Sequence, residues 1–262
     1  MTDLKSKNYK NLKEKFFSIN AQATEYDFGD GKTWFKQHRS GTTGIGKTFE
    51  DLLDKKEDNL QLPDFEGIEI KTHEGASMIT LFTKSPNLPR GASTSLRNKF
   101  GYVTDDSGIN ILHTSVPSNH LQLNTQSNHY FCITDNVQNS TIDLNVYDSN
   151  KKLVDNKAQA QWSYAAIEKA INSKLKELAI VLTDVKKVGK TSYYNYNKII
   201  VANIDKDVVL SALDKGVLLV DLRLGAYKSG KKKGKSHDHG TGFRITLDNL
   251  KKMTSFETLA EL

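Results

Sequence analysis

Residues 64–71, with the sequence DFEGIEIK, constrain the fold of this chain more than any other segment. On a strand, side chains two residues apart point the same way and lie about 6.6 Å apart. The pattern therefore predicts a strand that places Glu69 and Lys71 on one face. The alternating residues Ile68 and Ile70 then enter a core on the other face.

A turn before Gly67 is expected to bring Asp64 back beside these two polar side chains. Two carboxylates hold a hard cation such as Mg²⁺ through oxygen. The cation polarises a phosphate and acidifies water, while a lysine orients the nucleophile and offsets developing charge. The cluster therefore fits metal-assisted phosphodiester cleavage. An acid-x-Lys pair also occurs on ordinary solvated strands, so this hypothesis needs support from the rest of the chain.

Composition places the chain among ordinary globular proteins. Its 262 residues are 37% hydrophobic and 26% charged, enough for one large domain or two small ones. The net charge of +6 favours a polyanionic partner only if the excess is clustered. The single cysteine, Cys132, excludes an internal disulfide and cysteine-cluster zinc sites, and we expect it in the core. The start of the chain shows no secretory signal, and no apolar run approaches the roughly 20 residues of a membrane span. We therefore expect a cytoplasmic protein.

The spacing of apolar residues predicts a mixed α/β fold with a central sheet and additional β structure. Predicted helices are 8–20, about 49–55 and 162–178. Predicted strands are 67–72, 78–83, 109–114, 129–134, 141–147, 179–183, 198–204, 217–224 and 242–247. The first helix should bury Leu12, Phe16, Phe17 and Ile19, and the last helix should bury an apolar face that includes Trp162 and Leu178. Residues 86–95, rich in Pro, Gly and Ser, predict a loop.

The segment 41–48, GTTGIGKT, matches the phosphate-binding loop of nucleotide hydrolases. Residues 217–221, VLLVD, match the strand that supplies a magnesium-binding acid to such enzymes. The surroundings disagree, because 35–40 is polar and basic where a buried strand is required, and the following helix is short. We favour a glycine turn with Thr48 as the helix N-cap. This turn would deliver Glu50 to the carboxylate cluster and place Lys47 near a phosphate.

A second constellation occupies residues 222–244. Five lysines fall within eight residues: Lys228, Lys231, Lys232, Lys233 and Lys235. A solvated loop is the alternative explanation for such a run. However, His237, Asp238, His239 and Arg244 follow it, and Arg223 precedes it. Arginine and histidine donate to guanine edges and aspartate accepts from cytosine N4, whereas lysines contact phosphates. A zinc site at His237-x-His239 is less favoured, because no cysteine lies nearby.

With both constellations considered, the chain resembles the MvaI/BcnI family of Type II restriction endonucleases. These enzymes are relatives of the MutH repair nuclease within the PD-(D/E)XK fold. The resemblance rests on residues 44–53 (GIGKTFEDLL), Asp64-x4-Glu69-x-Lys71-Thr72, and the run from His237 to His239 followed by Arg244, with Arg223 and Tyr227 upstream.

The resemblance implies a mixed central sheet flanked by helices, with a β-rich DNA-recognition lobe that forms a cleft. The expected parts are a catalytic lobe at 1–185, with a β-rich insertion at about 85–160, and a DNA-recognition lobe at 186–262. Asp64 and Glu69 would bind one or two Mg²⁺ ions, which Mn²⁺ can replace. Lys71 would orient the attacking water, and Glu50 would support the site. Base readers would be Arg223, Tyr227, His237, Asp238, His239 and Arg244, and phosphate contacts would be Lys47, Lys231, Lys232, Lys233 and Lys235.

The resemblance also implies a monomer that cuts one strand of double-stranded DNA per binding event, at a short CCNGG-type pseudopalindromic site. A cognate methyltransferase is expected in the host, without a stable complex. A MutH-like mismatch-repair nickase is the alternative function. A DNA-binding module without catalysis is a further alternative, against which the intact Asp64, Glu69 and Lys71 argue.

Overall fold

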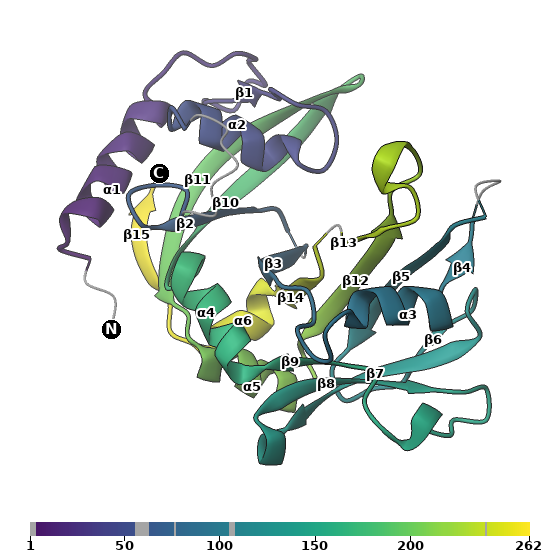
Figure 1. Cartoon of the computed structure of the whole chain (residues 1–262). Helices are drawn as coiled ribbons and strands as arrows, with labels where there is room; N and C mark the ends of the chain where they lie inside the picture. Colours follow the sequence, from purple (N-terminus) through teal and green to yellow (C-terminus); the bar gives the residue numbers. More distant parts are fainter. Residues whose placement is uncertain (1–3, 56–62, 76, 105–107, 239) are drawn as a thin grey trace. The chain divides into compact units, whose positions relative to one another are not determined.

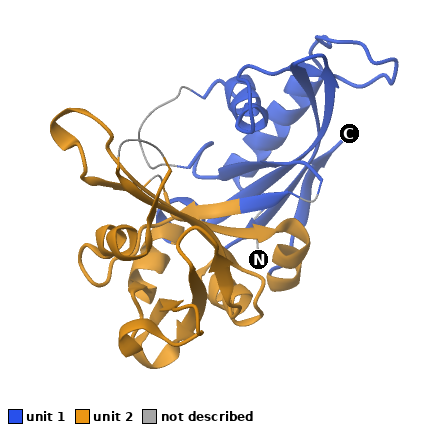
Figure 2. Ribbon diagram, turned by 90° about the vertical axis from the view of Figure 1, so that its right-hand side faces the viewer, with its two compact units in different colours: residues 1–79, 172–204, 254–262 blue, residues 80–171, 205–253 orange. Residues whose placement is uncertain are grey.

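The computed structural model describes residues 4–55, 63–75, 77–104, 108–238 and 240–262 (Figure 1). The chain forms two compact units, of which unit 1 comprises 1–79, 172–204 and 254–262, and unit 2 comprises 80–171 and 205–253 (Figure 2). These units differ from lobes divided at 185/186, a position that lies inside a strand of unit 1. The stretch predicted as a β-rich insertion, 85–160, falls wholly within unit 2.

Unit 1 is built on a mixed sheet with the strand order β1–β11–β10–β2, and β15 also pairs with β11. The strands are β1 (Phe35–Lys36), β2 (Glu69–His73), β10 (Glu177–Val188), β11 (Thr191–Asn203) and β15 (Glu257–Glu261). β2 runs parallel to β10, whereas β1 and β15 run antiparallel to β11. β10 and β11 form the long green hairpin of Figure 1, whose turn contains Gly189 at a φ of 58°.

Two helices, α1 (Lys7–Asn20) and α2 (Gly44–Leu52), pack against this sheet through one hydrophobic core. From α1 the core receives Tyr9, Leu12, Phe16 and Ile19, which recur every three or four residues. The prediction that Phe17 joins this face is wrong: Phe17 is 41% exposed, because it follows Phe16 by about 100° around the helix. Ile68 and Ile70 are buried in the same core, as their alternation with Glu69 predicts.

The second helix begins earlier than its sequence indicates. The prediction placed Thr48 at the N-cap of a helix starting near 49, but α2 begins at Gly44 and Thr43 is its N-cap. A Cβ atom on Gly44 would lie 2.2 Å from the Arg39 carbonyl oxygen, so this glycine permits a close approach inside a helix. Thr48 is buried within the helix, and its hydroxyl accepts a hydrogen bond from the His38 amide (2.9 Å).

Unit 2 contains most of a sheet with the strand order β3–β14–β12–β5–β4, and β13 also pairs with β12. Its strands are β3 (Met78–Thr83, which crosses the unit boundary), β4 (Tyr102–Val103), β5 (Asn110–Pro117), β12 (Leu219–Ala226), β13 (Ser236–Asp238) and β14 (Gly242–Thr246). A further sheet, β6–β7–β8–β9, comprises Gln122–Asn124, His129–Asn136, Thr141–Tyr147 and Ala160–Ser163. The helices are α3 (Ala92–Phe100), α4 (Tyr164–Lys174, crossing the boundary), α5 (Lys206–Asp214) and α6 (Leu247–Met253).

Most predicted strands are confirmed, and Cys132 lies buried on β7 as expected. Two predictions in this region need correction. The helix predicted at 162–178 is shortened at both ends, because Trp162 belongs to β9 and Leu178 belongs to β10. Trp162 is fully buried, and its Nε1 donates to the Lys84 carbonyl (2.8 Å), a contact that local spacing cannot reveal. The loop predicted at 86–95 ends early, at the start of α3.

The chain therefore has a mixed α/β fold, with several sheets and flanking helices. Within the part of the chain that the structure describes, no helix is both long and apolar enough to span a membrane.

Candidate functional site

A tight turn precedes β2 and brings two of the predicted acids together. Phe65 and Ile68 exchange both backbone hydrogen bonds, of 3.0 and 2.8 Å. Between them, Glu66 and Gly67 both adopt positive φ, at 45° and 91°, which is the pattern of a two-residue hairpin turn. The turn places the residues that flank it, Asp64 and Glu69, near one another, as the sequence predicts.

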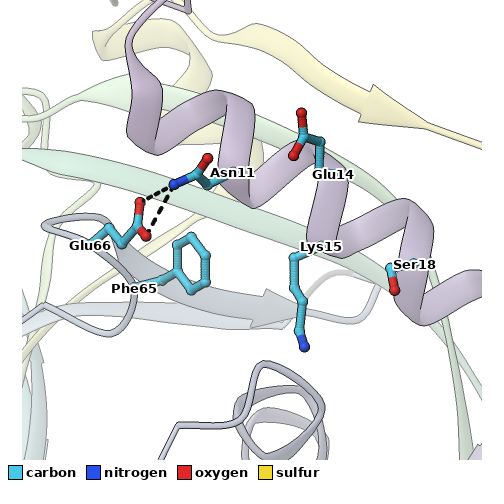
Figure 3. A pocket seen from close by; sticks show the side chains of 6 residues that line it. All are labelled: Asn11, Glu14, Lys15, Ser18, Phe65 and Glu66. Atoms are coloured by element: carbon cyan, nitrogen blue, oxygen red, sulfur yellow. Dashed lines mark hydrogen bonds between the residues drawn. The ribbon is translucent and has the colours of Figure 1, made fainter.

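Helix α1 holds this turn from outside. The Asn8 side chain donates to the Glu66 carbonyl (2.6 Å), and Asn11 donates to both carboxylate oxygens of Glu66 (2.8 and 3.1 Å). A left-handed backbone is unfavourable for a residue with a side chain, so these contacts offset a local cost. Figure 3 shows Asn11 directed at Glu66 beside a shallow hollow of about 370 Å³, which is lined by Asn11, Glu14, Lys15, Ser18, Phe65 and Glu66.

Asp64 has partners for both of its carboxylate oxygens. Oδ2 accepts the backbone N–H of Ile70 (2.9 Å), and Oδ1 accepts from the Lys55 ammonium group. Burial by itself would raise the pKa of Asp64, but these two hydrogen bonds and the charge of Lys71 hold it below its usual range. Asp64 is therefore an ionised carboxylate in a largely buried position.

Glu69 differs from Asp64 in that only one of its carboxylate oxygens has partners in the described part of the chain and its pKa is shifted upward. Its Oε1 accepts from the Lys71 ammonium group and lies 3.4 Å from Lys174 Nζ. Its Oε2 is buried and has no hydrogen-bond partner among the described residues. Burial raises the pKa of Glu69, and the charge of Asp64 adds to that effect while Lys71 opposes it. The site thus retains one buried acceptor atom without a partner.

Glu50, in the last turn of α2, joins the same cluster. Burial and the neighbouring charge of Asp64 raise the pKa of Glu50, whereas Lys55, Lys47 and Lys71 oppose the shift. The structure therefore brings the predicted catalytic residues Glu50, Asp64, Glu69 and Lys71 together within unit 1.

Sequence reasoning missed two lysines that contact these acids, Lys55 and Lys174. Lys55 stands in the charged run DKKED at 54–58, and Lys174 ends α4, so each resembles a solvated surface residue. The alternation that marked Lys71 could not mark either of them, because they reach the acids through tertiary contacts.

The donor set of this cluster suits a hard cation. No group of three or more His, Cys, Asp and Glu side chains surrounds a single metal position in the described residues. Mg²⁺ does not require such a cage, because it keeps several waters and binds through one or two carboxylates together with a substrate phosphate. Asp64 and the unpartnered Oε2 of Glu69 can supply those carboxylates.

Lys47 is engaged within its own helix. Its ammonium group lies 2.6 Å from Asp51, one turn later, and Asp51 also contacts His38 Nδ1 (2.9 Å). The bond from Lys47 and the contact with His38 lower the pKa of Asp51. The structure thus gives Lys47 a local partner, and its contact with a phosphate remains a prediction.

A second polar cluster, which we call the arginine face, lies on one face of the unit 2 sheet. Asp221 and Arg223 alternate along β12, and Arg244 on β14 stands beside them through its pairing with Leu219. Asp221 Oδ2 lies 3.6 Å from Arg223 Nε and 3.5 Å from Arg244 Nη1. On β5, Ser115 pairs with Asp221 and donates to its Oδ1 (2.8 Å).

The two arginines keep donor atoms without partners. The Nε atoms of Arg223 and Arg244 are buried and make no hydrogen bond within the described residues. Arg223 Nη2 donates to the Gly240 carbonyl (3.0 Å). The side chains are nevertheless 43% and 31% exposed, so part of each guanidinium remains accessible to a ligand.

His237 lies opposite Gly225 of β12, and its ring stacks on Tyr227 with centroids 4.8 Å apart. Lys232 Nζ lies 5.3 Å from the centre of the Tyr227 ring, and this lysine and the others at 231, 233 and 235 are exposed. Asp238 accepts from the Gly240 amide (2.8 Å) and the Thr241 hydroxyl (3.1 Å), so its carboxylate also stabilises the turn. His239 lies outside the described residues.

Two more features of unit 2 were not singled out by sequence reasoning. Asp221, considered only as a possible magnesium ligand of a nucleotide hydrolase, faces both arginines instead. Its position two residues before Arg223 on a predicted strand was an available signal. Arg97, on α3, is buried and donates to Asn110 O (2.8 Å), Gly234 O (3.2 Å) and Ser236 Oγ (3.1 Å), which ties the lysine-bearing segment to β5.

Comparison with known proteins gives consistent findings. The MvaI/BcnI restriction endonuclease family matches residues 30–253. The restriction endonuclease MvaI in complex with its cognate DNA substrate is similar with a TM-score of 0.82 and 38% identity, covering 97% of this chain and 99% of that one. MvaI in the absence of DNA is similar with a TM-score of 0.64 and 38% identity, covering 99% and 100%. A comparison with curated proteins returned no match.

Proposed function

Because the chain belongs to the MvaI/BcnI family of restriction endonucleases, and is therefore a deoxyribonuclease that hydrolyses phosphodiester bonds, we propose a specific chemistry for its two polar clusters. The proposed enzyme is of Type II, depends on Mg²⁺ and cuts double-stranded DNA at a short specific site. The observation that carries this proposal is the pairing of Lys71 with Glu69 beside Asp64, with Glu69 Oε2 left unpartnered. This arrangement within unit 1 also supports assigning its sheet to the PD-(D/E)XK fold.

In the proposed reaction, Asp64 and Glu69 hold one or two Mg²⁺ ions, which Mn²⁺ can replace. When bound, the cation polarises the scissile phosphate and makes water a better nucleophile. Lys71 keeps its ammonium group beside Glu69, where it orients the attacking water and offsets charge on the phosphate. Glu50 supports the cluster from α2. Because its pKa is raised, its carboxylate binds a proton more strongly than that of an ordinary glutamate.

The arginine face is proposed to read bases in the major groove. Arg223 and Arg244 keep part of each side chain exposed, and a guanidinium forks onto the O6 and N7 atoms of guanine. His237, stacked on Tyr227, is positioned to donate to a base edge, and Asp238 and His239 complete the predicted set. The exposed lysines at 231, 232, 233 and 235, with Lys47 in unit 1, are proposed to contact phosphates, which position the enzyme without specifying sequence.

We further propose a CCNGG-type pseudopalindromic site, cut one strand per binding event by a monomer. The MvaI complex with cognate DNA supports a duplex substrate. Two partly exposed arginines on one face are consistent with a site that contains adjacent guanines. The enzyme would act in the cytoplasm, where a cognate methyltransferase protects the host DNA.

Incubation of the purified chain with plasmid DNA and Mg²⁺, followed by mapping of the fragment ends, tests the proposal. Discrete fragments that share one short motif at their ends are expected. A nicked circle that is never linearised would favour a MutH-like nickase instead. Cleavage that persists in a metal chelator would contradict the role of Asp64 and Glu69 as cation ligands.

A further inference from the structure

We infer that Lys55 competes with the metal ion for Asp64, and that its ammonium group must leave this carboxylate before the cation can bind. The inference rests on the proposed metal dependence and deepens it. It gives the site a built-in counter-ion that lowers its affinity for metal when no DNA is present.

The first argument is the occupancy of Asp64. One of its oxygens accepts the amide of Ile70, which belongs to the strand backbone and is fixed there. The other oxygen accepts from Lys55. Each carboxylate oxygen has two lone pairs, but the positive charge of Lys55 repels a cation that approaches Oδ1, and the long lysine side chain can move away.

The second argument is the contrast with Glu69. Both lysines near Glu69, Lys71 and Lys174, approach the same oxygen, Oε1. The other oxygen, Oε2, accepts no hydrogen bond from the part of the chain that the structure describes. Glu69 can therefore accept a cation at Oε2 without losing its lysines. Both oxygens of Asp64 already accept a hydrogen bond, and Lys55 is the mobile, charged donor that a cation at Oδ1 displaces.

The third argument is how the chain delivers Lys55. After α2 the backbone turns at Asp54, which has a left-handed φ of 61° and forms an ion pair with Lys15 of α1 (2.5 Å). The amide of Lys55 then donates to the Glu50 carbonyl (3.0 Å). These contacts fix the base of the Lys55 side chain and direct it back toward the acids, so its place is built into the fold.

Charge explains why displacement is possible. The carboxylates of Glu50, Asp64 and Glu69 are offset by the ammonium groups of Lys55, Lys71 and Lys174. A divalent cation added to this set would leave an excess of positive charge. Releasing Lys55, whose side chain is 24% exposed, relieves that excess and makes the lysine available to the phosphate backbone.

The test is binding of Mn²⁺ to the full chain without DNA, with free Mn²⁺ counted by electron paramagnetic resonance. Lys55→Met should bind Mn²⁺ about tenfold more tightly than the wild type, because the competing charge is gone. Lys174→Met is the matched control, because it removes the same charge from Glu69, which keeps Lys71. For this control we expect a change of no more than about threefold.

Thermal unfolding gives a second readout. Without metal, Lys55→Met should unfold at a lower temperature than the wild type, because buried Asp64 loses its ammonium partner. Saturating Mn²⁺ should raise the unfolding temperature of this variant more than that of the wild type. Lys55→Gln, which keeps a donor without the charge, should behave in the same direction and serves if Lys55→Met does not fold.

Equal tightening in the Lys55 and Lys174 variants would overturn the inference, since it would show only a general charge effect. Weaker or unchanged Mn²⁺ binding by Lys55→Met would overturn it as well, and so would the absence of binding in every protein. The proposed function fails separately, on the wild-type plasmid assay, which does not involve these variants.

Discussion

The carboxylate cluster of unit 1 and the arginine face of unit 2 leave opposite kinds of atoms without partners. In the carboxylate cluster the atom without a partner among the described residues is an acceptor, Glu69 Oε2, and ammonium groups already balance the acids there. In the arginine face the atoms without a hydrogen bond to the described residues are donors, the Nε groups of Arg223 and Arg244, and both side chains lie beside the carboxylate of Asp221.

This difference indicates what each cluster binds. A buried polar group without a partner costs about 1–3 kcal/mol, so a fold that keeps one gains by filling it with a ligand. The unpartnered acceptor among the carboxylates is suited to bind a cation. The arginine donors on the polar sheet face are suited to an acceptor-rich edge such as that of guanine. The chemical step and the sequence preference should therefore respond separately to mutation.

The largest expected effect concerns the chemical step alone. Lys71→Ala should lower the single-turnover cleavage rate at least roughly 10³-fold, because the charge that orients water and stabilises the phosphate is lost. Affinity for the specific site, measured by fluorescence anisotropy with the metal omitted, should remain within about threefold of the wild type. Lys187→Ala, which removes an exposed lysine of the same unit, is the control. Normal cutting by Lys71→Ala would show that the active site is misassigned.

The next effect concerns recognition alone. Arg244→Ala should cost about 1–3 kcal/mol of discrimination between the specific site and a site with one changed base pair. Lys233→Ala is the matched comparison, because it removes an exposed positive charge from the same unit. It should weaken binding to all sequences alike and reduce the slope of affinity against salt by about one. If Arg244→Ala behaved like Lys233→Ala, Arg244 would be a phosphate contact.

The sequence revealed the carboxylate cluster because local rules control most of it. Alternation along β2 predicts that Glu69 and Lys71 share a face, and the two lie in contact. The return of Asp64 follows from a turn of two residues, one of them glycine. What remained hidden were Lys55, which lies nine residues before Asp64 and reaches it through the turn after α2, and Lys174, which reaches Glu69 from α4. Their local sequence carries no signal of that contact.

The errors in the fold have the same origin. Gly44 indicates a turn when read locally, but its lack of a Cβ serves contacts with the Arg39 carbonyl and the Tyr194 hydroxyl, the latter 150 residues away. Trp162 continues the apolar spacing of α4, yet it belongs to β9, where it pairs with Ile142 of β8 and its indole donates to the Lys84 carbonyl. In both cases a tertiary contact overrides a correct local pattern.

A smaller effect should follow from loosening the turn between Asp64 and Glu69. Asn11→Ala removes the side chain that holds Glu66 in its left-handed conformation. We expect cleavage to slow by about three- to tenfold in kcat with little change in KM, because the two acids are less well positioned. Glu14→Ala alters the same hollow without removing an Asn11 bond and should cut normally. A change in KM alone would show that α1 affects DNA binding rather than the active site.

The smallest effect is on stability, and it has the opposite sign from the effect on function. Because the pKa of Glu69 is raised, its ionised form is less favourable in the folded protein than in the unfolded chain. Stability should therefore rise as the pH falls through the folded-state pKa, and at neutral pH the charge is a cost. Glu69→Gln should raise the free energy of unfolding of the metal-free protein by about 1 kcal/mol, or the unfolding temperature by about 2–4 °C, while abolishing cleavage.

Calorimetry of both proteins in a chelator, from neutral pH down toward pH 4.5, measures this effect. The gain of Glu69→Gln over the wild type should shrink as Glu69 becomes protonated, because the two side chains are then both neutral and nearly the same shape. An Asn11→Ala background should not change the gain, since the turn bonds are distinct from those of Glu69. A variant less stable than the wild type at neutral pH would mean that Lys71 and Lys174 outweigh the cost of burial. The unpartnered acceptor would then be no sign of a missing cation, and the contrast with the arginine face would lose its physical basis.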